Sequence, residues 1–143
     1  MSDTTLRNAA LLTPEQLRSR LDEFYQAVQE FNDGYYFESH ETLEDLWMVT
    51  PEPERQLFQA IIQLAAAFVH LSRGELPGTI KLLDAACDKL SDFTPEALGL
   101  DVAALRSAAG LARSELAGLG PEQFLRWDLA HIPVMTAERS TAV

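Results

Sequence analysis

Apolar residues recur along the chain at the spacing of helices that bury one face. Between Thr13 and Gly34 the apolar positions lie three or four residues apart, at Leu17, Leu21, Phe24, Val28 and Phe31. Thr13 and Gln16 form the pattern of a capping box, and Pro14 suits the first position of a helix. Gly34 can end the helix because glycine accepts a positive φ. The pattern therefore predicts one helix from Pro14 to about Asn32.

Similar start and stop signals predict four further helices. The second runs from about Tyr36 to Val49, and Pro51 and Pro53 separate it from a third over about Glu54 to Ser72. A fourth helix follows Pro77-Gly78 and turns these residues inward: Ile80, Leu83, Ala86, Cys87 and Leu90. Asp101 caps a fifth helix, whose inner residues are Leu105, Ala109, Ala112 and Leu116.

No segment shows the period-two alternation of a strand, so we expect no strands. The predicted fold class is all-α: a single-domain helical bundle of about five helices. We expect a flexible leader over residues 1–12, a bundle over residues 13–128 and a tail over residues 129–143.

Composition narrows the class of protein. A chain of 143 residues with 47% hydrophobic residues is long enough for one core. Its net charge of −11 opposes binding to nucleic acid and to anionic membranes. The longest uncharged run, between Arg55 and Arg73, contains glutamines and a histidine, which indicates a buried helix and not a membrane span. Cys87 is the single cysteine, and no secretory signal pattern opens the chain, so we expect a cytoplasmic protein.

Polar residues stand on the inward faces of the second and third helices. At 100° per residue, His40 and Glu44 share a face with the apolar residues Tyr36, Leu43 and Trp47. The third helix carries no charge on the side opposite its apolar face; that side holds Gln56, Gln59, Gln63, Ala66, Ala67 and His70. An unpaired polar group on a buried face is costly, so we infer that His40, Glu44, Gln63 and His70 face one another.

Three interpretations of this cluster stay open. It could be a buried hydrogen-bonded network that sets the register of the helices. It could be a metal site in which His40, Glu44 and His70 bind a divalent metal such as zinc, with Glu41 as a further ligand. It could also be an acid–base pair of His40 and Glu44 in a ligand pocket. Trp47 and the aromatic residues at positions 35–37 would then line that pocket.

Two blocks of sequence resemble a known family. The first reads FNDGYYFESHETLEDLW over residues 31–47, and the second reads ERQLFQAIIQLAAAFVH over residues 54–70, followed by Arg73-Gly74 and Gly78. Both resemble the uncharacterised prokaryotic family called domain of unknown function 309, over about residues 20–92. That family usually has Gly in place of Ala60 and Asn in place of Glu75. The resemblance implies a small all-α bundle and no particular activity.

Two classes of function remain. The favoured one is a non-enzymatic scaffold that binds a small molecule, a protein partner or a second copy of the chain, with the polar cluster specifying its fold. The alternative is a metal-dependent hydrolase with His40, Glu44 and His70 as ligands and Glu41 as its base. The chain has no nucleophile elbow, phosphate loop or CxxC motif, which favours the scaffold.

Overall fold

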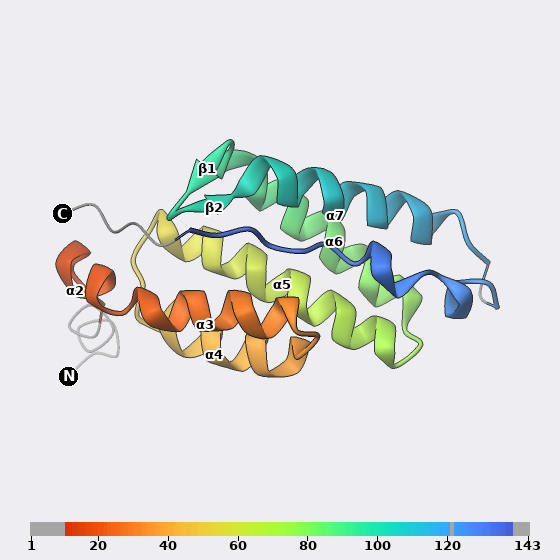
Figure 1. Cartoon of the computed structure of the whole chain (residues 1–143), viewed down its shortest axis with the longest axis horizontal. Helices are drawn as coiled ribbons and strands as arrows, with labels where there is room; N and C mark the ends of the chain where they lie inside the picture. The colour runs from red at the N-terminus through yellow and green to blue at the C-terminus, as the bar shows by residue number, and fades with distance from the viewer. Residues whose placement is uncertain (1–10, 121, 139–143) are drawn as a thin grey trace, which may run out of the picture.

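The all-α bundle that the periodicity predicts is confirmed. The computed structural model describes residues 11–120 and 122–138, so the predicted leader lies outside the described residues except for Leu11 and Leu12. The described chain forms six α-helices (Figure 1): α2 Pro14–Ser19, α3 Leu21–Asn32, α4 Tyr36–Met48, α5 Glu54–Ser72, α6 Leu76–Leu90 and α7 Val102–Ala117. Short 3₁₀ turns, η1 to η3, lie at Ser91–Phe93, Phe124–Arg126 and Leu129–His131. None of the described helices is apolar over a length that would cross a membrane.

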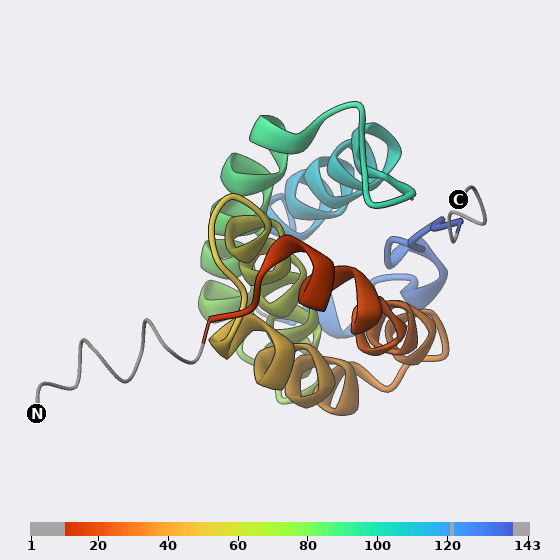
Figure 2. The same cartoon turned by 90° about the vertical axis from the view of Figure 1, so that its left-hand side faces the viewer.

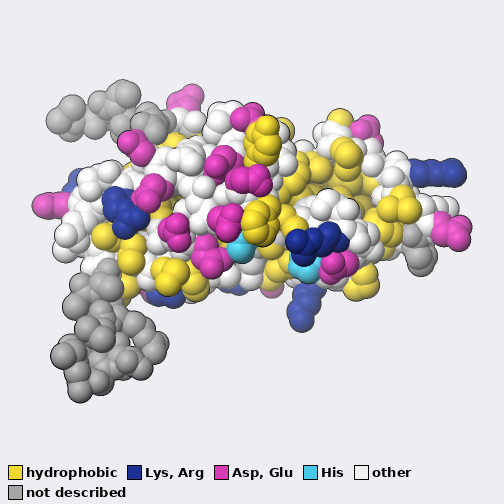
Figure 3. Space-filling model, turned by 90° about the horizontal axis from the view of Figure 1, so that it is seen from below, with side chains coloured by type: hydrophobic (Ala, Val, Ile, Leu, Met, Phe, Trp, Pro, Cys, Tyr) yellow, Lys and Arg dark blue, Asp and Glu magenta, His cyan; other side chains and the backbone are white. Residues whose placement is uncertain are grey.

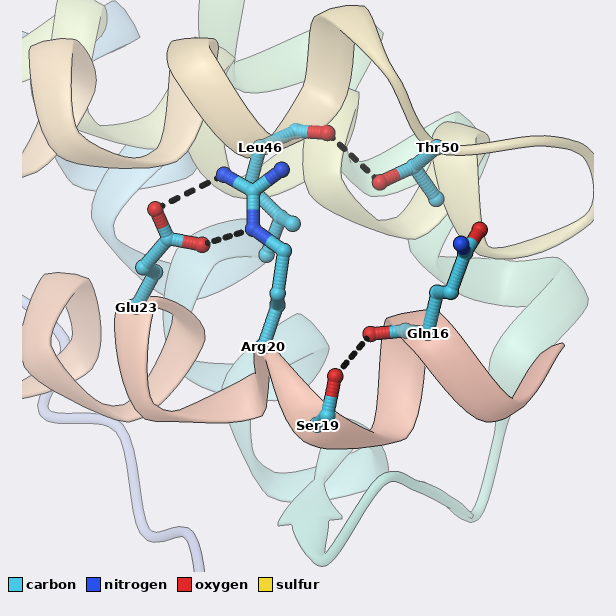
Figure 4. A network of polar contacts seen from close by, with 6 residues as sticks. All are labelled: Gln16, Ser19, Arg20, Glu23, Leu46 and Thr50. Atoms are coloured by element: carbon cyan, nitrogen blue, oxygen red, sulfur yellow. Dashed lines mark hydrogen bonds and ion pairs between the residues drawn. The ribbon is translucent and has the colours of Figure 1, made fainter. Parts of the chain in front are cut away.

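The predicted first helix is in fact two helices, because the backbone leaves helical geometry at Arg20. The capping box at its start is present, since Gln16 N–H donates to Thr13 Oγ1 at 3.2 Å and Thr13 N–H donates to Gln16 Oε1 at 2.9 Å. At the break, Arg20 has φ −109° and ψ 8°, and its guanidinium donates twice to Glu23, at 2.7 and 2.8 Å (Figure 4). The apolar stripe continues through the break because both helices turn to the same core. Periodicity alone therefore cannot reveal it.

A two-stranded hairpin corrects the expectation that no strand would form. Strands β1 (Glu96–Ala97) and β2 (Leu100–Asp101) pair antiparallel around a turn at Leu98 and Gly99. Both turn residues have positive φ, 52° and 80°, as a two-residue hairpin turn requires. Strands of two residues are too short to leave an alternating pattern in the sequence. The hairpin is held to α3 by the Tyr25 hydroxyl, which donates to the Leu98 carbonyl at 2.9 Å.

Helices α3 and α4 are joined in the same way as α5 and α6, forty positions further along the chain. Each turn ends on a glycine with positive φ, Gly34 at 89° and Gly74 at 77°. In each, the next residue donates back to a carbonyl five positions earlier, from Tyr35 to Glu30 and from Glu75 to His70, at 2.8 and 3.0 Å. The described bundle therefore contains two related helix–turn–helix units.

A buried hydroxyl group joins the two helices of each unit. Ser39 Oγ donates to the Ala27 carbonyl at 2.7 Å, and Thr79 Oγ1 donates to the Ala67 carbonyl at 3.2 Å. Both hydroxyl residues are at most 1% exposed, and both bonds cross from one helix to its partner. An alanine at the acceptor position lets the two backbones approach closely enough for this bond. The sequence repeat is weak because these few positions, and not whole segments, define it.

Helix α5 is the centre of the bundle, and α4 lies at its edge. Ten residues of α5 are buried, whereas α4 has only three buried residues, Ser39, Leu43 and Leu46. The segment after η3 runs in the opening between α3 and α7 (Figures 1 and 2) and pairs with the hairpin through Leu100 and Ala137. Met135, within the predicted tail, is 2% exposed. This C-terminal segment therefore closes the core on the side away from α4.

Candidate ligand-binding site

His40 and Glu44 meet one turn apart on α4. His40 Nε2 lies 3.1 Å from Glu44 Oε2, and the two side chains are 30% and 46% exposed. The ring of Phe37 stacks on the His40 imidazole with centroids 6.3 Å apart. The other ring nitrogen of His40, Nδ1, is buried and has no hydrogen-bond partner among the described residues. The pair that the sequence predicts is present, but it stands at the surface of the bundle.

His70 pairs with the turn that follows its own helix. Its Nδ1 lies 2.8 Å from Glu75 Oε2, and the two side chains are 35% and 48% exposed. The ring rests on the backbone of α6, where a Cβ added to Gly78 would lie 3.2 Å from Nδ1. The carboxylate that His70 meets belongs to the residue directly before α6.

The four predicted cluster residues therefore divide into separate contacts. His40 and His70 do line one small cavity of about 110 Å³ between α4 and α5, together with Phe37, Ala66, Val69 and Arg73. Gln63 is half-buried, and its Oε1 is buried without a hydrogen-bond partner among the described residues. The structure brings the two histidines to a shared cavity, but it does not join the four side chains in one buried network.

The carboxylates and imidazoles do not assemble a set of metal ligands. Across residues 11–120 and 122–138, no three His, Cys, Asp or Glu side chains lie close enough together to hold a metal ion. His40 and His70 each have a separate carboxylate partner, and Glu41 is exposed on α4. Trp47 is half-buried, with the guanidinium carbon of Arg55 4.3 Å from its ring centroid.

A larger cavity lies at the end of the bundle, and Tyr36 is the one residue of the predicted pocket that lines it. It has a volume of about 390 Å³ and lies between the start of α4, the end of α5 and residues 124–132. The residues that line it are Gly34, Tyr36, Phe68, Leu71, Ser72, Phe124, Leu125, Trp127, Leu129 and Ile132. None of these described residues carries a charge. We name this space the end cavity.

Tyr36 and Ser72 are the two hydroxyl-bearing residues among those that line the end cavity. The Tyr36 ring packs against Phe31 and Phe68, with centroids 5.0 and 5.6 Å apart. Burial raises the pKa of the Tyr36 hydroxyl above its ordinary value, so the group stays neutral. The hydroxyl has no hydrogen-bond partner in the described chain, and it is therefore free to donate to or accept from a ligand.

Glu115 of α7 holds the far wall of the end cavity in place. Its Oε1 accepts a hydrogen bond from Trp127 Nε1 at 3.0 Å and lies 3.0 Å from His131 Nδ1. The bond from Trp127, and then the contact with His131, lower the pKa of this carboxyl group. His131 Nε2 is also 3.7 Å from Asp128. Trp127 and His131 lie 12 and 16 positions from Glu115 along the chain, so helix periodicity could not predict that they meet it.

Comparison with known proteins agrees with the sequence resemblance. Residues 24–82 match the model of a family described as Domain of unknown function (DUF309), which confirms the resemblance over that stretch. The matched residues run from α3 into α6 and so contain most of both helix–turn–helix units, including His40, Gln63 and His70. Trp127 and Glu115 lie outside the match. A comparison with curated proteins found no match to the chain.

Proposed function

We propose that the protein is a non-enzymatic scaffold that binds an uncharged, largely apolar small molecule in the end cavity. One observation carries this proposal: about 390 Å³ of space is lined by aromatic and aliphatic side chains from three separate parts of the chain. Ligand pockets in proteins have volumes of roughly 300–1,000 Å³ and walls of this composition. A space of this size is large enough for a ligand with two or three aromatic rings.

The chemistry of the walls selects the class of ligand. A charged group would lose its hydration on entry and would find no opposite charge on the described walls, so charged ligands are disfavoured. Aromatic and branched aliphatic groups fit walls that include Phe68, Phe124 and Trp127. A single hydroxyl, carbonyl or amine on the ligand would pair with the Tyr36 hydroxyl. The absence of a charged residue among the described wall residues also favours binding over acid–base catalysis.

Two exposed leucines support a route into the end cavity. Leu125 and Leu129 line it, yet they are 73% and 68% exposed to solvent. Leucine side chains at the mouth of a pocket can close over an apolar ligand and gain burial when it binds. Their exposure in the free protein therefore fits a mouth better than a closed core.

A neutral fluorescent probe tests the proposal. N-phenyl-1-naphthylamine carries two aromatic groups and one uncharged amine, and its emission rises in apolar surroundings. We expect saturable binding at one site per chain. Ser72 is exposed at the wall of the end cavity, so Ser72→Trp should obstruct it and weaken probe binding about tenfold, a change of about 1.4 kcal/mol.

Leu111→Trp is the matched control, because Leu111 is 63% exposed on α7 and does not line the end cavity. Its affinity for the probe should stay within twofold of the unmodified protein. Tyr36→Phe should weaken binding of the amine probe while leaving the helical circular dichroism unchanged. Non-saturable binding, or equal affinity in the Ser72→Trp and Leu111→Trp variants, would show that the end cavity is not the site.

A further inference from the structure

The outer side of α4 exposes large apolar side chains. Phe37 and Met48 are 51% and 60% exposed, at the two ends of the helix. They are eleven positions apart, which at 100° per residue places them on one side of the helix and about 16 Å apart along it. Tyr35, directly before the helix, is 58% exposed. Side chains of this kind are normally buried, so their alignment on one surface requires an explanation.

Acidic residues occupy the same helix between the two apolar ends. Helix α4 carries no Lys or Arg, and its acidic residues are Glu38, Glu41, Glu44 and Asp45. Figure 3 views the molecule from the side on which α4 lies and shows acidic side chains gathered beside hydrophobic ones. Glu41 and Glu44 fall within 40° of the line from Phe37 to Met48. Along its length, the outer surface of α4 therefore has an apolar side chain at each end and acidic side chains between them.

The nearby basic residues leave this surface negative. Arg20 forms its ion pair with Glu23 while also interacting with Asp45, and Arg55 lies over the ring of Trp47. Arg73 lines the small cavity beside Phe37, at one end of the helix, and the four carboxylates of α4 outnumber these three arginines. The surface therefore keeps an excess of carboxylates, and the chain as a whole has a net charge of −11. Such a surface attracts cationic partners and repels anionic ones.

We propose that the outer surface of α4 is a docking site for a basic amphipathic helix of another protein. The partner helix would carry two apolar residues about three turns apart, to cover Phe37 and Met48, with Lys or Arg between them to meet Glu41 and Glu44. Helices of this design bind through their apolar anchors, and complementary charge adds rate and selectivity. This surface is distinct from the end cavity, and the proposal does not depend on the ligand proposed above.

The negative charge of this surface also disfavours three other partners: a second copy of the chain, nucleic acid and an anionic membrane. A second copy of the chain would place the same carboxylates opposite one another, because a symmetric interface pairs a surface with itself. Nucleic acid and anionic membranes carry the same sign of charge as α4. A cationic polypeptide with apolar anchors is the partner that satisfies both parts of the pattern.

A designed peptide tests the proposal on the full chain. The probe is a capped, fluorescein-labelled helix of alanine and glutamine in which two leucines, eleven positions apart, bracket four lysines. We expect fluorescence anisotropy to show saturable binding that weakens as salt is added. The variant Glu41→Gln/Glu44→Gln/Asp45→Asn removes the two carboxylates that meet the partner and the one beside them, and it should weaken binding about tenfold and remove most of its salt dependence.

The matched control changes the net charge equally at another place. Asp88→Asn/Asp92→Asn/Glu122→Gln neutralises three exposed carboxylates away from α4, and its affinity should stay within twofold. Phe37→Ala/Met48→Ala should weaken binding about tenfold, while Leu111→Ala should not change it. Circular dichroism confirms that each variant folds.

Three results would overturn the proposal. One is that the two charge variants weaken binding equally, which would show attraction to the whole chain. Another is that a peptide with alanines in place of its leucines binds as tightly, which would show attraction to any polycation. The last is the absence of saturable binding to the unmodified protein.

Discussion

Asn32 holds the backbone of Met135 with both ends of its side-chain amide. Its Nδ2 donates to the Met135 carbonyl at 2.8 Å, and Met135 N–H donates to its Oδ1 at 2.8 Å. The two residues are 103 positions apart, so this pair joins the end of α3 to the C-terminal segment. The side-chain amide of Asn32 thus makes the two backbone hydrogen bonds with Met135 that a neighbouring strand would otherwise make. The same segment carries Ile132 to the wall of the end cavity.

Asn32→Ala should destabilise the protein by about 1–3 kcal/mol, because it leaves two backbone groups of the half-buried Met135 segment without partners. Urea denaturation with a shared m-value measures the change. Gln29→Ala is the control. Gln29 lies about one turn before Asn32 on α3, and its side chain makes only an exposed hydrogen bond with Asp33. That variant should stay within about 0.5 kcal/mol. Equal midpoints for the two variants would mean that the Asn32 pair does not hold the segment.

Protonation of Glu115 in acid should loosen the contact that holds Trp127 at the wall of the end cavity. The pKa of Glu115 is lowered in the folded state, so its stabilising effect is complete above the unfolded value near 4.5 and is lost as pH falls through the folded value. In a Trp47→Phe background, emission from Trp127 should change in that acidic window and stay constant above it. Glu115→Gln can still accept the indole N–H but carries no charge. Persistence of the same acid step in that variant would assign the step to another group.

Two glycines with positive φ should differ in their tolerance of alanine. A Cβ on Gly34 meets nothing within 4 Å, so Gly34→Ala should cost only the backbone strain, about 1–2 kcal/mol. A Cβ on Gly99 would lie 1.9 Å from the Glu138 carbonyl oxygen, so Gly99→Ala should cost about 1–3 kcal/mol more. Thermal unfolding of the two variants gives the comparison. A similar melting temperature would show that residues 136–138 do not pack against the hairpin in solution.

Two helical glycines should respond in opposite ways to the same change. Gly110→Ala in α7 should stabilise the protein by about 0.5–1 kcal/mol, because a Cβ there meets nothing within 4 Å and alanine favours the helix. Gly78→Ala in α6 should lose that gain, because its Cβ would press on the His70 ring and disturb the contact with Glu75. Chemical denaturation at one pH measures both. Equal stabilisation would mean that the His70 ring moves away without cost.

Local pattern was sufficient for most of the helical fold. The apolar spacing, the Thr13 capping box and the glycines that follow α3 and α5 locate the helices because these signals act between residues a few positions apart. The family resemblance rests on the same stretch and is confirmed over residues 24–82. The break at Arg20 and the hairpin at Leu98 escaped prediction because neither changes the apolar period.

The site depended on contacts that the sequence does not encode locally. Helical periodicity correctly placed His40 near Glu44, since they are one turn apart on α4. It could not show that His70 turns to Glu75, because that choice depends on how α6 leaves the turn. The end cavity joins residues about 100 positions apart, from Tyr36 to Ile132. The sequence by itself determined the helices and their buried faces, whereas only tertiary packing decided which polar groups meet and where space remains, because both depend on the docking of distant segments.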